Sequence, residues 1–114
     1  MNKEVTTQTK QIIWINPNLI NGTEIVNNNC AKYNFKEIED AANWIYFYKT
    51  MKDSCIPDDQ ILDIKPIAKA YDIFFADMVK VSQKDGKFIL SGENDQRIQA
   101  ALICHVPLIP VILI

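Results

Sequence analysis

Seven residues of this chain have the type and position needed to bind a small polar ligand. In open α/β sheets, ligands lie beyond the carboxyl ends of the strands, and the first turn of a helix offers free backbone N–H groups to an anion. These two rules select the residues that follow an expected strand or precede the last expected helix: Asn16, Asn18, Asp77, Ser91, Gly92, Glu93 and Asn94. The same residue types also cap helices and form turns, so capping is the alternative interpretation.

The remaining reactive side chains do not form a recognisable catalytic or metal-binding set. His105 is the only histidine, and its neighbour Cys104 would point to a different face of the same helix. Only a distant Cys30 or Cys55 could approach His105 as a nucleophile. The three cysteines include no C-x-x-C motif, which excludes the common zinc and thioredoxin-like motifs. We therefore expect reduced thiols, no metal and no cofactor.

Composition excludes several classes of function. The chain has 114 residues, 48% hydrophobic and 23% charged, with a net charge of -2, which fits one globular domain. Its three glycines form neither a Walker A loop nor a G-x-G-x-x-G motif, and its single arginine, Arg97, lies in no basic cluster. The nearest candidate for a membrane span, Val106 to Ile114, is too short and holds two prolines. We expect a cytoplasmic protein with a flexible tail at 1–10 and a single domain at 11–114.

Hydrophobic periodicity predicts strands that alternate with helices. The clearest helix is 35–53, where apolar residues recur at three- and four-residue spacing. A weaker helix is expected within 19–31, and another begins near Pro57 and is kinked or divided by Pro66. Further elements are listed in chain order: strands at 11–16 and 71–78, a hairpin at 79–91 that turns at Lys84-Asp85-Gly86, a helix at 95–105 and a strand at 108–114. This order predicts an α/β fold, a small three-layer sandwich with a mostly parallel sheet and an antiparallel hairpin at its edge.

Three short segments in the second half of the chain resemble a known family. They are Ala70-Tyr71-Asp72-Ile73, Asn94 to Ala101, and Ile109-Pro110-Val111-Ile112. In this order they are similar to the distal half of nucleoside deoxyribosyltransferase-like Rossmannoid domains, which share a general plan with Toll/interleukin-receptor domains. The opening Ile12 to Pro17 is similar to the first strand of that family. The resemblance implies a Rossmann-like fold and a nucleoside-like ligand.

The catalytic glutamate of that family is not matched in this chain. At the corresponding helix position the chain has Gln96 or Arg97, and Glu93 falls one turn early. Loss of the carboxylate removes the nucleophile, so the resemblance implies binding without turnover. A phospho-receiver domain is the other α/β plan of this size, but it would have Asn16 and Asn18 in place of its metal-binding carboxylates.

The C-terminal stretch 106–114 carries no charge, and it is either a buried strand or a surface that a partner covers. Its candidate interface residues are Leu108, Ile109, Val111, Ile112, Leu113 and Ile114. We therefore expect a small soluble non-catalytic interaction or regulatory domain that acts through a protein partner or by self-association. The alternative is a nucleoside- or nucleotide-binding or -processing Rossmannoid enzyme. Neither hypothesis involves nucleic acid or a membrane.

Overall fold

The computed structural model of the chain describes residues 11–21, 33–91 and 95–114. Three expectations lie wholly or mostly outside these residues: the tail at 1–10, the weak helix within 19–31, and the candidate ligand residues Gly92, Glu93 and Asn94. The described beginning of that weak helix is instead the end of a 3-10 helix, η2 (Pro17–Leu19), followed by a short strand, β2 (Ile20–Asn21).

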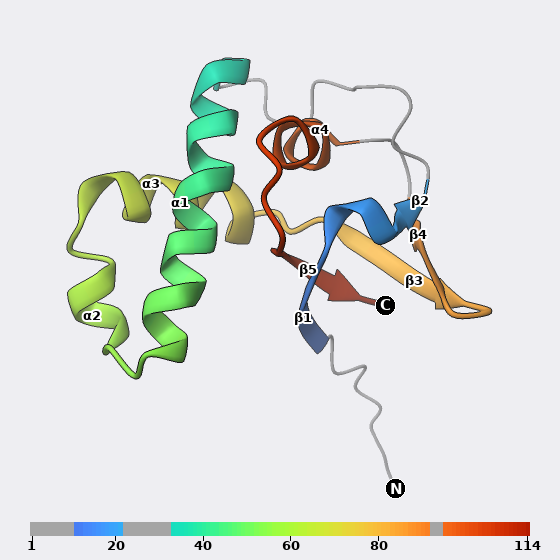
Figure 1. Cartoon of the computed structure of the whole chain (residues 1–114), viewed down its shortest axis with the longest axis horizontal. Helices are drawn as coiled ribbons and strands as arrows, with labels where there is room; N and C mark the ends of the chain where they lie inside the picture. The colour runs from blue at the N-terminus through green and yellow to red at the C-terminus, as the bar shows by residue number, and fades with distance from the viewer. Residues whose placement is uncertain (1–10, 22–32, 92–94) are drawn as a thin grey trace, which may run out of the picture.

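Five strands form one mixed sheet (Figure 1). They are β1 (Gln11–Ile15), β2, β3 (Lys80–Lys84), β4 (Lys87–Leu90) and β5 (Ile109–Leu113), in the spatial order β1-β5-β3-β4-β2. The pairs β3–β5 and β2–β4 are parallel, whereas the pairs β1–β5 and β3–β4 are antiparallel. The α/β class is confirmed, but the expectation of a mostly parallel sheet is wrong.

The hairpin and the first strand explain why the sheet is mixed. Asp85 and Gly86 have φ values of 52° and 77°, and two consecutive positive φ values fold β4 back beside β3 in a tight turn. The hairpin is therefore confirmed, but β2 pairs with β4, so the hairpin does not form the edge of the sheet. β1 joins the other end of the sheet antiparallel to β5.

The helix expected at 35–53 is confirmed as α1 (Phe35–Asp53). Asn34 caps it, because its Oδ1 accepts a hydrogen bond from the backbone N–H of Glu37 at 2.8 Å. Glu37 Oε1 in turn accepts a hydrogen bond from the backbone N–H of Asn34 at 2.9 Å, which completes a capping box. The residues buried on one face of α1 are Ile38, Ala41, Ala42, Ile45 and Tyr48. Their spacing is the one that the sequence predicts.

The segment 57–78 is mostly helical, which corrects the strand expected at 71–78. α2 (Asp58–Ile61) and α3 (Lys65–Phe75) are separate helices, because Pro66 lies in the first turn of α3, where its missing N–H costs no hydrogen bond. The residues buried on α3 are Ile67, Ala70, Ile73 and Phe74, which recur at helical spacing. Packing of this face against the core outweighs the strand propensity of the aromatic residues near its end.

α4 (Gln96–Ile103) confirms the last expected helix, and it ends in an uncommon way. His105 has a φ of 56°, a left-handed conformation that usually requires glycine. Two backbone N–H groups satisfy the end of the helix: His105 donates to the carbonyl of Leu102 at 3.2 Å, and Val106 donates to that of Ala101 at 2.9 Å. This pattern is a Schellman motif.

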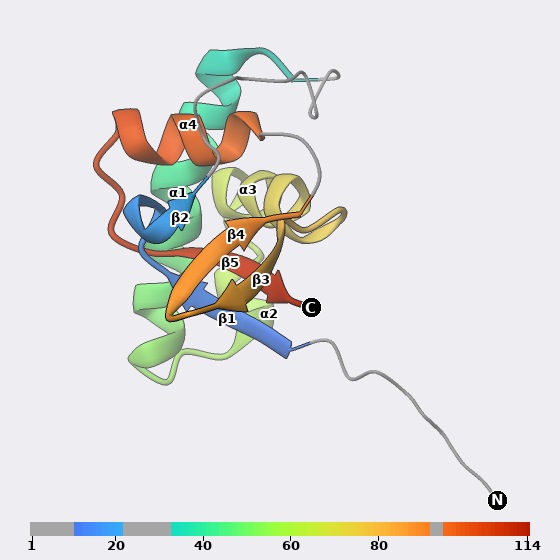
Figure 2. The ribbon, with the colours of Figure 1, turned by 90° about the vertical axis from the view of Figure 1, so that its right-hand side faces the viewer.

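The helices α1, α3 and α4 gather on one side of the sheet (Figures 1 and 2), so the described residues do not confirm a three-layer sandwich. β5 (Ile109–Leu113) lies between β1 and β3, so the strand within 106–114 is a central strand and not an open edge. Of the candidate interface residues, Ile109 and Val111 are fully buried in the hydrophobic core, whereas Ile114 is 55% exposed. None of the described helices is long and apolar enough to cross a membrane.

Candidate functional site

Asp77 and Ser91, two of the candidate ligand residues, line one small pocket beside the first turn of α4. The pocket has a volume of about 100 Å³, and Asp95 and Arg97 form part of its wall. Asp77 lies between α3 and β3 and not at the carboxyl end of a strand, whereas Ser91 directly follows β4. The structure thus brings these two residues together, although the expected position of Asp77 in the fold is wrong.

A buried ion pair occupies the centre of this region. Asp95 caps α4 and is 5% exposed, and Arg97 is 3% exposed. The Oδ1 of Asp95 accepts from Arg97 Nε at 2.8 Å, and its Oδ2 accepts from Arg97 Nη2 at 2.7 Å, which is a bidentate pair. Arg97 Nη1 donates to the carbonyls of Ile73 at 2.8 Å and Asp77 at 2.6 Å. The only arginine of the chain therefore ties α4 to the end of α3.

This arrangement leaves little capacity for a ligand. The guanidinium of Arg97 and the carboxylate of Asp95 are hydrogen-bonded to each other. The other two charged side chains at the pocket, Asp77 and Lys80, form an exposed ion pair at 3.5 Å. A volume of about 100 Å³ is also well below the roughly 300 Å³ of typical small-molecule sites. Gln96, in the first turn of α4, has a buried Oε1 without a partner among the described residues.

The other two described candidates, Asn16 and Asn18, do not line this pocket. They face each other in the turn after β1, where Asn16 Oδ1 accepts from the backbone N–H of Asn18 at 2.8 Å and from its Nδ2 at 3.0 Å. Asn16 is thereby the cap of η2. The alternative interpretation, capping, accounts for the bond from the backbone N–H of Asn18, and the bond from its Nδ2 joins the two side chains within the same turn.

Cys30 lies outside the described residues, and Cys55 and Cys104 are free thiols. Cys55 and His105 are both exposed at helix ends, and both have a positive φ. Cys104 is half-buried, and its Sγ lies 3.8 Å from the carbonyl oxygen of Glu39. In the part of the chain that the structure describes, no three His, Cys, Asp or Glu side chains lie together in a way that could hold a metal ion.

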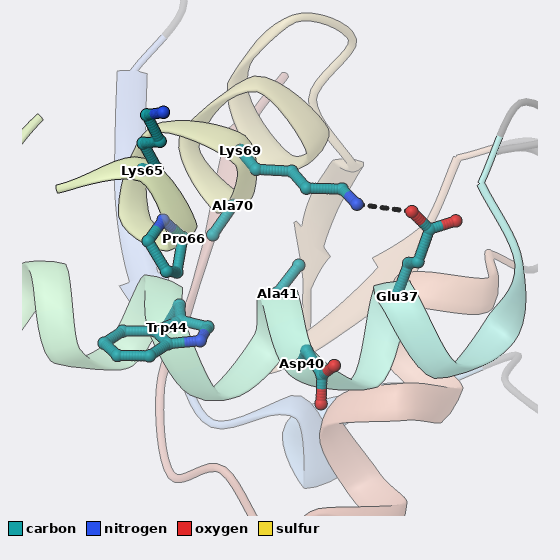
Figure 3. A pocket seen from close by; sticks show the side chains of 8 residues that line it. All are labelled: Glu37, Asp40, Ala41, Trp44, Lys65, Pro66, Lys69 and Ala70. Carbon is teal, nitrogen blue, oxygen red and sulfur yellow. Dashed lines mark hydrogen bonds and ion pairs between the residues drawn. The ribbon is translucent and has the colours of Figure 1, made fainter.

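A larger groove lies between α1 and α3, with a volume of about 390 Å³ (Figure 3). Small residues, Ala41 and Ala70, allow the two helices to approach each other, and Trp44 and Pro66 lie side by side at one end. Trp44 is half-buried, and its ring packs edge-on against the exposed Phe47 at a centroid distance of 5.7 Å. The groove therefore presents an aromatic surface to solvent.

Charged side chains border this groove on both helices. Lys69 of α3 forms an ion pair with Glu37 of α1, which bridges the groove (Figure 3). The hydrogen bond from Lys69, together with the backbone N–H of Asn34, holds the pKa of Glu37 below its usual value. Asp40 pairs with Lys36 at 3.2 Å on its own helix. Lys65 forms no ion pair within the described residues, so it is the lysine of the groove whose charge is available to a partner.

A second pocket of about 320 Å³ lies where α1 and α3 meet β1. Its aromatic walls are Trp14, Tyr48, Tyr71 and Phe75, and Lys49, Lys52 and Asp53 lie at its rim. The rings of Tyr71 and Phe75 stack at 4.3 Å between centroids, and Lys49 Nζ lies 5.7 Å from the centre of the Trp14 ring. Burial, together with the carboxylate of Asp58, raises the pKa of Tyr48 to about 12.

Sequence reasoning missed both larger pockets, because each is built from residues that are distant in the chain. One signal was present: Trp44 and Phe47 fall outside the buried stripe of α1, so at least part of their surface had to face something other than the core. The chain matches no protein-family profile, no curated protein and no solved structure.

Proposed function

We propose that this chain is a non-catalytic interaction domain that binds an acidic segment of a protein partner in the groove between α1 and α3. The observation that carries the proposal is the half-buried Trp44 at the groove, bordered by a lysine, Lys65, that has no ion pair within the described residues. Tryptophan, with tyrosine and arginine, is enriched among the energetic anchors of protein interfaces.

The chemistry of the partner follows from the groove. An apolar side chain of the partner would pack on Trp44 and Pro66, where the small residues Ala41 and Ala70 leave room for it. A carboxylate next to that side chain would pair with Lys65. Complementary charge at the rim adds specificity and speeds association more than it adds affinity.

The buried pair of Asp95 and Arg97 supports the absence of catalysis. Both charges are engaged within the chain, so neither is free to act on a ligand at the first turn of α4. The remaining pocket volume of about 100 Å³ suits ordered water better than a nucleoside.

Selection of random displayed peptides against the full chain tests the proposal. We expect enriched peptides with an aromatic or aliphatic residue beside acidic residues, and about 30-fold weaker binding to Trp44→Ala, because an anchor contributes about 2 kcal/mol or more. Lys65→Glu, at an exposed position, should lose the acidic peptides, whereas the control Lys87→Glu on β4 should keep them. Equal binding of the peptides by wild type and Trp44→Ala would overturn the proposal.

A second candidate function, binding of a nucleoside-like molecule, is favoured by the aromatic pocket at β1. Stacked rings and two lysines suit a planar base that carries a phosphate. A ligand that binds only the native state must raise the melting temperature. Nucleosides, nicotinamide nucleotides and cyclic nucleotides should therefore include one that stabilises wild type but not Tyr71→Ala. If none of them raises the melting temperature of wild type, this candidate is rejected.

A further inference from the structure

The two edges of the sheet differ in how they are protected against pairing with another chain. β2, at one edge, has only two residues. β1, at the other edge, has the five residues Gln11–Ile15, which include no charged residue and no proline. Short strands, charges and prolines are the usual devices that prevent two sheet edges from joining. β1 has none of them, and no other described strand pairs with its outer side.

We propose that the outer edge of β1 pairs with β1 of a second copy of this chain, antiparallel and about a two-fold axis. The pairing would join two five-stranded sheets into one continuous sheet. It adds self-association to the proposed function, on a surface separate from the groove between α1 and α3.

In this arrangement, the side chains of β1 can lie beside those of β1 of the second copy, each on the same face of the sheet as the residue opposite it. An axis at Ile13, the middle residue, pairs all five residues and places Ile12 opposite Trp14 of the second copy. Ile13 lies opposite Val111 on β5, so it shares the buried face of the sheet, and it would meet the same face of the second copy. No side chain is moved to the wrong face by this register. Pairs of an aromatic with a β-branched residue are also among the favourable cross-strand pairs.

Exposure and charge near β1 favour a second copy as the occupant. Ile12 is 51% exposed, and antiparallel pairing would place it beside Trp14 of the other copy, whose ring packs against Tyr48 and Phe75 of its own chain. Because β1 contains no charged residue, its pairing with a second β1 places no like charges opposite each other. Beside it, α1 carries both signs, because Lys49 and Asp53 form an ion pair at 2.7 Å. A patch that contains both signs can complement its own copy across a two-fold axis.

The expected dimer is weak. Five paired residues extend over about 17 Å, so the strand pair and its flanking side chains fall at the small end of the range for protein interfaces. We therefore expect a monomer–dimer equilibrium in the micromolar range or weaker, which becomes visible as the protein is concentrated.

Sedimentation equilibrium of the full chain over a wide concentration range tests the pairing. The average mass should rise from 13.1 kDa toward twice that value as the concentration increases. Ile12→Asp should keep the protein monomeric, whereas Ile89→Asp, an equally drastic change at an exposed strand position of β4, should leave the equilibrium unchanged. A constant monomer mass up to about 1 mM, or equal dimerisation of Ile12→Asp and wild type, overturns the proposal.

Crosslinking tests the register. In a chain whose three cysteines are replaced by serine, Ile13→Cys places two thiols opposite each other across the axis, and oxidised glutathione should link them into a covalent dimer. Ile12→Cys would lie opposite Trp14 and should crosslink far less. Efficient crosslinking of Ile12→Cys, with none of Ile13→Cys, excludes an axis at Ile13.

Failure of this inference can be told from failure of the proposed function, because the two use different surfaces. Trp44→Ala should lose peptide binding and keep the dimer. Ile12→Asp should lose the dimer and keep peptide binding. A variant that loses both, with an unchanged melting temperature, would mean that one surface serves both roles, and the separate β1 pairing would be refuted.

Discussion

Replacement of His105 by glycine should stabilise this protein. His105 follows α4 with a φ of 56°, a conformation that costs a residue with a Cβ about 1–2 kcal/mol. Its side chain is exposed and makes no hydrogen bond or ion pair within the described residues. The substitution therefore removes the strain of the Cβ and no described side-chain interaction.

The net effect is smaller than the strain, because glycine also stabilises the unfolded chain. Its greater backbone freedom there costs the folded state about 0.5–1 kcal/mol. The difference predicts that His105→Gly raises the free energy of unfolding by about 0.5–1 kcal/mol. The Schellman hydrogen bonds from His105 and Val106 come from the backbone and remain in place.

Urea unfolding followed by circular dichroism measures this change, and thermal unfolding should show a rise of about 2–6 °C. His105→Ala is the matched control, since it removes the imidazole and keeps the Cβ, and it should match wild type. Gly86→Ala should show the opposite sign, because Gly86 has a φ of 77° and an added Cβ meets no atom within 4 Å, so only backbone strain acts.

Two results would refute this reasoning. If His105→Gly is no more stable than His105→Ala, the Cβ at this position is not strained. If Gly86→Ala is as stable as wild type, a positive φ carries no measurable cost in this protein. A strained Cβ would then also not be expected at Cys55, which follows α1 with a φ of 64°.

Three further predictions concern the interior. Arg97→Ala should lower the free energy of unfolding in urea by about 3–5 kcal/mol, because the buried carboxylate of Asp95 loses its cation. The double variant Arg97→Ala/Asp95→Asn should recover part of this loss. If it recovers none, the unpaired carboxylate is not the cause of the loss. The pKa of Tyr48 is raised from 10.0 to about 12, so between these pH values the unfolded chain releases a proton that the folded chain keeps, and stability falls as pH rises. The fall in urea midpoint from pH 10 to pH 12 should be smaller in Tyr48→Phe but not in the exposed control Tyr46→Phe, and equal falls in all three proteins would exclude Tyr48 as its source. Phe74→Ala should cost about 3–5 kcal/mol in the same assay, since Phe74 is fully buried, and a cost under 1 kcal/mol would mean that the core can collapse around the cavity.

The best predicted elements are those whose signals are local. α1 has its cap at Asn34, its buried stripe and its first-turn glutamate within one segment, and both of its bounds agree with the expectation. The hairpin depends on the residues at its turn, Asp85 and Gly86, which adopt the positive φ values that this turn type requires. The scarcity of glycine, the single arginine and the absence of nucleotide-binding motifs were likewise visible without a structure.

The candidate site was predicted only in part. Asp77 and Ser91 do lie at one pocket, but Asn16 and Asn18 do not line it, and Asp77 follows a helix instead of a strand. Residues 71–75 have strand-forming types, and burial of Phe74 on a helical face decided their conformation. Short apolar runs of this kind fit either element, and contacts with other parts of the chain settle which one forms.

By itself, the sequence determined the α/β class, the position of most helices and strands, and the lack of a recognisable catalytic set. The tertiary structure alone decided the order of the described strands, the central place of β5, the position of β1 at the end of that order and the groove at Trp44. The physical reason is the range of the interactions. Caps and turns act over a few residues, whereas strand pairing joins Gln11 to Leu113, and Arg97 donates to the carbonyl of Ile73, 24 residues away. Such contacts form only when the chain is folded, so whether an arginine is a free surface charge or a buried tie between helices cannot be read from its neighbours in sequence.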